Sequence, residues 1–286
     1  VTSAPLSLHG NAALQSPLCG LPGQQDYTQV KVTGSTATLH NLLFDSCFDR
    51  SVANTVVIQV SNTGNVIVNR STFRNLAHRV TINPVATTDG AAIQLLDSST
   101  CTIIDSLFDS NFAQSCGGSI YVGPATMAHI TGSTFVRNTA GFLANYALNS
   151  KVTNAHALGG GAICVNGGLL TVVDSLFDSN NASNYLVDDA NVGKNFHEIS
   201  NGGAVLLLCP GRRPDNGGCS VSTFRRTSFS NNNAENIGGA IFAVAGTTLL
   251  LDECNATKNI DASNIGIAVH RARGIGVHNR TRRSTD

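Results

Sequence analysis

Tryptophan is absent from the sequence, and Lys, Arg, Asp and Glu together make up only 13% of its 286 residues. The formal net charge at pH 7 is +0, so the chain lacks the basic excess expected of a nucleic-acid-binding protein. No run approaches about 20 consecutive apolar residues, the length that a membrane-spanning helix needs. We therefore expect no nucleic-acid partner and no membrane span in this chain.

A targeting segment is also missing, since no positively charged leader precedes an apolar run and the chain does not begin with Met. We therefore expect a mature form or a piece of a longer protein. The eight cysteines are even in number, as disulfides allow. Four Asn-x-Ser/Thr sequons are candidate glycosylation sites, at Asn69, Asn181, Asn255 and Asn279. Together these features favour a secreted, extracellular protein in an oxidising setting.

Glycine is abundant, with 28 residues, and two short elements recur along the chain. The first is GGA[I/V], at Gly90-Ala-Ala-Ile93, Gly117-Gly-Ser-Ile120, Gly160-Gly-Ala-Ile163, Gly202-Gly-Ala-Val205 and Gly238-Gly-Ala-Ile241. The second is FxxN, at Phe108-Asp-Ser-Asn111, Phe135-Val-Arg-Asn138, Phe177-Asp-Ser-Asn180 and Phe229-Ser-Asn-Asn232, with degenerate copies at Phe44-Asp-Ser-Cys47 and Phe73-Arg-Asn75. The two elements alternate, which indicates a repeat architecture.

The spacing of these elements predicts the fold. Gly90 to Gly117 and Phe108 to Phe135 are both 27 residues apart, and longer units add residues mainly just after FxxN. Such a unit is too short for two parallel strands joined by a helix, and it shows no helical period. Segments such as 169–174 and 248–252 look like strands instead. Each unit therefore predicts one coil of an all-β, right-handed parallel β-helix of the pectin-lyase-like type, with side loops.

Equivalent residues of successive coils should then lie over one another. We expect an aliphatic column from the Ile and Val of GGA[I/V] and an aromatic column from the Phe of FxxN. A hydroxyl two residues before each Phe should share its inward face, because side chains alternate along a strand. The Asn of FxxN should form an amide column at a turn, with each side chain bonded to the next coil.

The alternating elements resemble those of the chlamydial polymorphic membrane proteins, whose passenger regions carry repeated GGA[I/L/V] and FxxN tetrapeptides. The resemblance covers roughly residues 70 to 269. Similar repeats occur in large surface proteins of other microbes, including algae and other protists. The resemblance implies secretion, a β-helical stalk and a role in adhesion.

The chain divides by its repeats into three parts. Residues 1–40 lack the repeat and contain three prolines, so they are expected to form a cap or linker. Residues 41–269 are expected to form the β-helix. Residues 270–286 are basic and polar and look like an exposed tail or linker.

Because packing explains a solenoid core, a binding site is expected in the insertions. Residues 141–157 and 183–199 both follow FxxN in neighbouring coils, so they should leave the same edge and touch. The candidate residues for binding a protein or glycan partner are Tyr146, His156, Tyr185, Asp188, Asp189, Phe196 and His197. The alternative is that these loops only decorate the side of the helix. Two adjacent Asp residues supply too few oxygen ligands for a metal site, and no cofactor is expected.

The cysteines allow one pairing to be predicted. Cys209 and Cys219 enclose a short stretch rich in turn residues, and we expect them to form a disulfide. Cys164 follows the Ile of its GGA[I/V] element and is expected to be a buried thiol. Cys19 and Cys47 could tie down the N-terminal cap, and the other pairings stay open.

Three functions are compatible with this fold. The first is a non-catalytic extracellular surface protein that acts in adhesion or as a scaffold. The second is a structural subunit of a glycosylated filament or cell-surface appendage, which would self-associate. The third is a polysaccharide lyase or hydrolase acting on acidic glycans, which needs clustered carboxylates on one face. The repeating Asp residues follow the coil period, which turn chemistry explains, so we expect no enzymatic activity.

Overall fold

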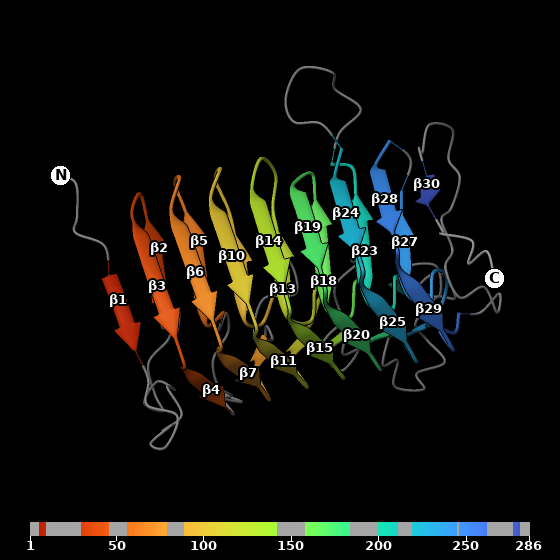
Figure 1. Ribbon diagram of the computed structural model, residues 1–286, viewed down its shortest axis with the longest axis horizontal. Coiled ribbons are helices and arrows are strands. Elements are labelled where there is room, and N and C mark those ends of the chain that lie inside the picture. The colour runs from red at the N-terminus through yellow and green to blue at the C-terminus, as the bar shows by residue number, and fades with distance from the viewer. Residues whose placement is uncertain are drawn as a thin grey trace, which may run out of the picture.

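The computed structural model describes residues 6–9, 30–45, 56–78, 89–141, 158–183, 200–210, 219–244, 246–261 and 277–280. They form a right-handed parallel β-helix whose coils follow one another along the longest axis of the molecule (Figure 1). No helix occurs in these described ranges, so none of their segments is a long apolar helix that could cross a membrane. The predicted all-β solenoid is confirmed.

Four sheets, all parallel, run along the solenoid, and five of the described coils contribute one strand to each. Sheet A contains β1 (Leu6–His9), β3 (Thr36–His40), β6 (Asn65–Asn69), β10 (Thr100–Ile104), β14 (Met127–Thr131), β19 (Leu169–Val173), β24 (Val221–Arg225), β28 (Thr248–Asp252) and β30 (Val277–Arg280). Sheet B contains β2 (Val30–Thr33), β5 (Ile58–Ser61), β9 (Ile93–Leu95), β13 (Ile120–Val122), β18 (Ile163–Asn166), β23 (Val205–Leu208) and β27 (Ile241–Ala243).

The shorter strands follow the turn after sheet A. Sheet C contains β4 (Leu43–Asp45), β7 (Thr72–Arg74), β11 (Leu107–Asp109), β15 (Thr134–Val136), β20 (Leu176–Asp178), β25 (Ser228–Ser230) and β29 (Asn255–Thr257). Sheet D contains β8 (Ala77–His78), β12 (Phe112–Ala113), β16 (Thr139–Ala140), β21 (Asn181–Ala182) and β26 (Asn233–Ala234). A separate pair joins β17 (Leu158–Gly159) to β22 (Ser200–Asn201). Within the two terminal segments predicted as caps or linkers, β1 and β30 extend sheet A at its ends.

The predicted apolar columns fill the interior. The aliphatic column pairs Ile93 with Ile120, Ile120 with Ile163, Ile163 with Val205 and Val205 with Ile241. In the aromatic column, Phe108 and Phe135 stack with their ring centroids 4.7 Å apart, and Phe135 and Phe177 are 4.8 Å apart. Every one of these side chains is fully buried. This spacing matches the distance between neighbouring strands, so burial and ring stacking repeat with each coil.

A hydroxyl column marks the turn from sheet A to sheet C. The Ser71 N–H donates to Ser106 Oγ at 3.2 Å, and the Ser106 N–H donates to Ser133 Oγ at 3.1 Å. Each hydroxyl in turn donates to the carbonyl oxygen two residues earlier, as Ser106 Oγ does to Ile104 O at 2.8 Å. The small side chain thus satisfies buried backbone groups where the chain bends away from the ladder.

The first glycine of GGA[I/V] permits the sharp turn into sheet B. Gly90 adopts φ +69°, a conformation that side chains rarely tolerate, and an added Cβ would lie 2.7 Å from the backbone nitrogen of Tyr121. The backbones of adjacent coils therefore approach too closely for any residue with a side chain.

Candidate functional site

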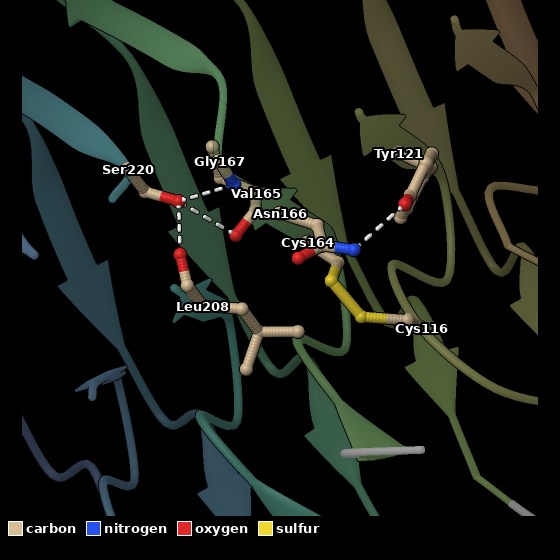
Figure 2. Close-up of a disulfide and its surroundings, with 8 residues drawn as sticks. All are labelled: Cys116, Tyr121, Cys164, Val165, Asn166, Gly167, Leu208 and Ser220. Carbon is tan, nitrogen blue, oxygen red and sulfur yellow. Dashed lines mark hydrogen bonds between the residues drawn. A yellow bond between two sulfur atoms is a disulfide. The ribbon is translucent and has the colours of Figure 1, made fainter. Parts of the chain in front are cut away.

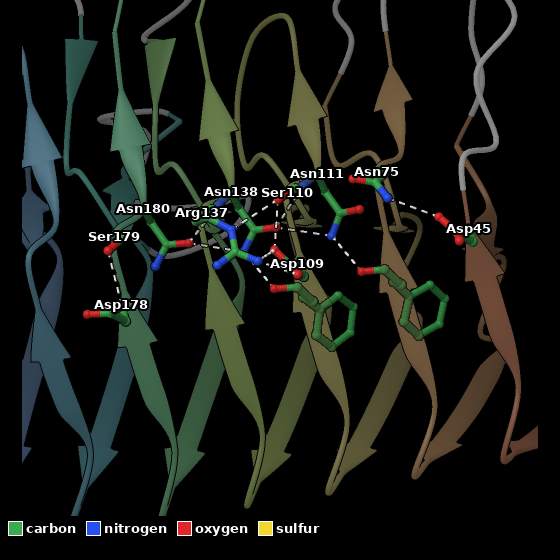
Figure 3. Close-up of polar contacts among 12 residues, drawn as sticks. Asp45, Asn75, Asp109, Ser110, Asn111, Arg137, Asn138, Asp178, Ser179 and Asn180 are labelled. Carbon is green, nitrogen blue, oxygen red and sulfur yellow. Dashed lines mark hydrogen bonds and ion pairs between the residues drawn. The ribbon is translucent and has the colours of Figure 1, made fainter. Parts of the chain in front are cut away.

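An asparagine column occupies the turn from sheet C to sheet D (Figure 3). The Asn138 N–H and Nδ2 both donate to Asn180 Oδ1 at 3.0 Å, while Asn138 Nδ2 also donates to Phe108 O at 3.0 Å. The same pattern recurs at each rung, from Asn111 through Asn138, Asn180 and Asn232 to Asn259. The side chains are buried, so their amide groups form hydrogen bonds within the solenoid and do not face a ligand.

Two members of this column were not predicted correctly. Asn259 belongs to the column, since its Oδ1 accepts from Asn232 Nδ2. It was missed because Ala256, and not Phe, stands three residues before it. In the coil of Phe73, the rung position is Leu76, whose N–H donates to Asn111 Oδ1 at 3.1 Å. Asn75, which the sequence suggested as a degenerate copy, lies one residue earlier and donates through Nδ2 to Asp45 Oδ1 at 3.0 Å. Pairing register, rather than resemblance to the tetrapeptide, therefore defines the column.

The repeating carboxylates on the outer surface have structural partners. Asp109 accepts two hydrogen bonds from Arg137 Nη2, at 2.7 and 2.6 Å, and Asp174 is held by Arg226 Nε at 2.6 Å. The hydrogen bond from Arg226 lowers the pKa of Asp174. Hydrogen bonds from Ser230, Asn231 and Ser179 lower the pKa of Asp178. A carboxyl group that acts as a general acid needs a raised pKa instead.

Metal ligands do not cluster in the part of the chain that the structure describes. There, no group of three or more His, Cys, Asp and Glu side chains lies close enough together to hold a metal ion. The candidate partner-binding residues lie outside the described residues: Tyr146, His156, Tyr185, Asp188, Asp189, Phe196 and His197.

The described ends of the two long insertions lie side by side. β16, which precedes the first insertion, pairs with β21, which precedes the second. The Gly141 N–H and the Ser183 N–H then continue the ladder, donating to Ala113 O and Ala140 O at 3.1 Å. After the insertions, β17 pairs with β22 in parallel. Both insertions therefore leave and return at adjacent places on one side of the solenoid, which we call the side-loop base.

A disulfide fastens the side-loop base to sheet B (Figure 2). Cys116 bonds to Cys164, and Cys116 also forms a β-bridge with Gly159 at the end of the first insertion. The expectation that Cys164 is a buried thiol was therefore wrong. Its side chain belongs to the apolar cluster on the outer side of sheet B, where it pairs in register with Tyr121 and bonds to Cys116 of the preceding coil. The reduced, buried cysteine on a strand is Cys101 instead, and burial raises the pKa of its thiol.

The disulfide belongs to a second apolar cluster outside the solenoid interior. Its buried members are Cys116, Tyr121, Cys164, Leu206 and Phe242. Asn166 Nδ2 donates to the Tyr121 hydroxyl oxygen at 3.0 Å, and burial raises the pKa of that hydroxyl group. Sheet B is therefore apolar on both faces over these coils, and its outer face is buried and cross-linked by a disulfide next to the side-loop base.

The other predicted disulfide is present. Cys209 bonds to Cys219 and closes the short insertion between β23 and β24. An added Cβ on Gly246 would lie 2.6 Å from Cys219 Sγ and 3.4 Å from Cys209 Sγ, so this glycine leaves room for the bridge. Cys19 and Cys47 lie outside the described residues.

The candidate glycosylation sites differ in their surroundings. Asn255 is exposed on β29. Asn181 is engaged through both ends of its amide, since Nδ2 donates to Ser183 Oγ and Oδ1 accepts from Asn233 Nδ2. The Oδ1 atom of Asn69 is buried. Asn279 lies on β30.

These columns and side loops define a β-solenoid repeat protein. Residues 226–244 match the family model described as the Chlamydia polymorphic membrane protein (Chlamydia_PMP) repeat. The matched segment runs from the turn before β25 to the strand β27, and so contains both Phe229-Ser-Asn-Asn232 and Gly238-Gly-Ala-Ile241. Comparison with curated proteins and with solved structures gave no match.

Proposed function

We propose that the protein is a non-catalytic, extracellular surface protein that acts in adhesion or as a scaffold, and that the side loops bind its partner. The side-loop base carries this proposal. Two long insertions emerge next to each other there, beside a face of sheet B that is stiffened by the Cys116–Cys164 disulfide. A rigid support beneath variable loops is a common arrangement for binding sites. The matched repeat and the two disulfides also suit a surface location.

The test is a binding assay with the full chain. Fluorescently labelled protein is applied to a glycan array and to intact cells of the source organism. We expect saturable binding that falls at least about tenfold in the variant Tyr185→Ser/Asp188→Asn/His197→Ser, as loss of about 1.4 kcal/mol would produce. The matched control is Arg212→Ser/Arg213→Ser in the insertion closed by Cys209 and Cys219, which should bind normally. Equal binding by both variants would count against the side loops.

The same material separates the two alternative functions. Negative-stain images of native protein that show filaments would favour the structural subunit. Release of unsaturated products from uronate polymers, followed by absorbance, would favour the lyase. Peptide mapping of native material tests glycosylation, and we expect a glycan on the exposed Asn255 but none on Asn181, whose Nδ2 is hydrogen-bonded in the fold.

A further inference from the structure

The two disulfides differ in their access to solvent. Cys209 directly follows β23, Cys219 stands two residues before β24, and both are partly exposed. By contrast, Cys116 is 3% exposed and Cys164 is 0% exposed, and both belong to the buried apolar cluster on the outer side of sheet B. In the coil that follows β24, the residue beside the Cys209 and Cys219 sulfur atoms is the exposed Gly246, so no side chain at that position covers them.

The turn that the Cys209–Cys219 bridge spans is also closed by hydrogen bonds. The Ser220 N–H donates to Leu208 O at 3.3 Å, and Ser220 Oγ lies 2.5 Å from the same oxygen (Figure 2). The equivalent turn after β13 has no cysteine, and there Thr126 donates to Gly123 O through its N–H at 3.3 Å and its Oγ1 at 2.7 Å. The turn after β27 has the same pair of hydrogen bonds. The backbone of this turn therefore keeps its contacts when the sulfur–sulfur bond is broken.

Neighbouring coils hold the strand ends on both sides of the bridge. Leu207 O accepts from the Val244 N–H at 3.0 Å. Ser220 O accepts from the Thr248 N–H at 2.9 Å, and Ser220 Oγ accepts from the Gly167 N–H at 2.9 Å. β23 and β24 are each paired in register with a strand on either side. Opening the bridge is therefore a local event that leaves these strands in place.

We propose that the Cys209–Cys219 bridge is a thiol-exchange site, at which the thiol of another molecule becomes linked to the folded protein as a mixed disulfide. The incoming thiolate forms a bond to one sulfur atom, and the bond between Cys209 and Cys219 breaks. The other sulfur atom leaves with the electron pair as a thiolate and takes up the proton that the incoming thiol has lost. The bridge itself is the oxidant, so the exchange needs no further reactant.

The linkage formed in this way is covalent and reversible. The freed cysteine can attack the mixed disulfide, which restores the bridge and releases the ligand as a thiol. Alternatively, a second thiol attacks the ligand's sulfur atom, which leaves Cys209 and Cys219 reduced and joins the two ligands in a disulfide. The site lies between sheets B and A, whereas the side-loop base follows sheet D. The proposal therefore does not rest on the function proposed for the side loops.

The test uses the full, disulfide-bonded chain, whose reduced cysteines are first blocked with iodoacetamide. One arm receives reduced glutathione, and the other receives a short peptide with a single cysteine at the same concentration. Samples are trapped with N-ethylmaleimide, acidified and mapped by mass spectrometry. We expect a mixed disulfide on Cys209 or Cys219 that forms at least about tenfold faster than any change at Cys116 or Cys164. The circular dichroism spectrum should stay unchanged.

The buried Cys116–Cys164 bridge is the internal control, because its reduction reports unfolding. The single variants Cys209→Ser and Cys219→Ser lack the cysteine that would reverse the exchange, so they should keep a glutathione adduct on the remaining cysteine after incubation with oxidised glutathione. Adducts with both probes would assign the site to protein-borne and small thiols, and an adduct with glutathione alone would assign it to small thiols. Modification of all four cysteines at one rate, loss of the folded spectrum during exchange, or no adduct on either single variant would overturn the proposal.

Discussion

Asn180 shows how one side chain can join three coils. Its amide donates to Phe135 O in the preceding coil and to Asn232 Oδ1 in the following coil, and its Oδ1 accepts from Asn138. An Asn fits this position because it is short enough to stay at the turn and carries both a donor and an acceptor. Replacing it leaves backbone and side-chain groups in both neighbouring coils without partners.

We therefore expect Asn180→Leu to lower the free energy of unfolding by roughly 3–5 kcal/mol, since each buried unsatisfied group costs about 1–3 kcal/mol. Denaturant unfolding followed by circular dichroism measures the change. The control is Asn233→Ser on the adjacent strand β26, an exposed position whose replacement should cost about 0.5 kcal/mol or less. A similar loss in both variants would contradict the role assigned to the column.

Low pH should reduce the stability of the folded protein through two carboxyl groups on its outer surface. The pKa values of Asp174 and Asp178 are both lowered in the folded protein, by hydrogen bonds from Arg226 and from Ser230. A carboxyl group with a lowered folded-state pKa stabilises the protein above its ordinary value of 3.8 and loses that contribution as the pH falls further. The melting temperature should accordingly drop below about pH 4. In Asp174→Asn/Asp178→Asn the drop should be smaller, and an unchanged pH profile would refute the assignment.

At the scale of strands and loops, the two disulfides close chain segments of different length. Cys116 and Cys164 are 48 residues apart, and Cys209 and Cys219 are 10 apart. In the chain-entropy model, loops of these sizes correspond to about 4 and about 3 kcal/mol. We expect Cys116→Ser/Cys164→Ser to lower stability more than Cys209→Ser/Cys219→Ser. Thermal unfolding of both variants checks the order, and the reverse order would contradict the argument from loop length.

The strands show what the sequence could and could not predict. The aromatic and aliphatic columns were predictable because Phe108, Phe135 and Phe177 recur with the Ile of GGA[I/V] at matching distances. Asn259 was missed because its coil has Ala256 instead of Phe, and only the pairing of β25 with β29 reveals the equivalence. The Cys116–Cys164 bridge was missed for a similar reason. Strand register pairs Cys164 with Tyr121, whereas Cys116 lies before β13 and bridges to Gly159, so the spacing of the repeats did not indicate that the two sulfur atoms meet.

At the scale of the whole molecule, one complete coil can be deleted while the stacking of the remaining coils is kept. Deleting residues 111–137 removes 27 residues and joins Ser110 to Asn138, which restores Phe-Asp-Ser-Asn. With Cys164→Ser to replace the thiol that loses its partner, we expect a folded protein with an unchanged β-type circular dichroism spectrum per residue. Deleting residues 111–130 instead breaks the register and should give an unfolded or aggregated product. Equal behaviour of the two deletions would contradict the stacked architecture.

The turn from sheet C to sheet D has a consequence for how such chains change over generations. Because the four coils of Phe108, Phe135, Phe177 and Phe229 present the same amide, hydroxyl and ring to the coils before and after them, an unequal crossover between two of these repeats yields a product whose junction already fits. The solenoid can then lengthen or shorten by one coil at a time while its cross-section is preserved. Its length can therefore vary between lineages without changes to the packing of its interior.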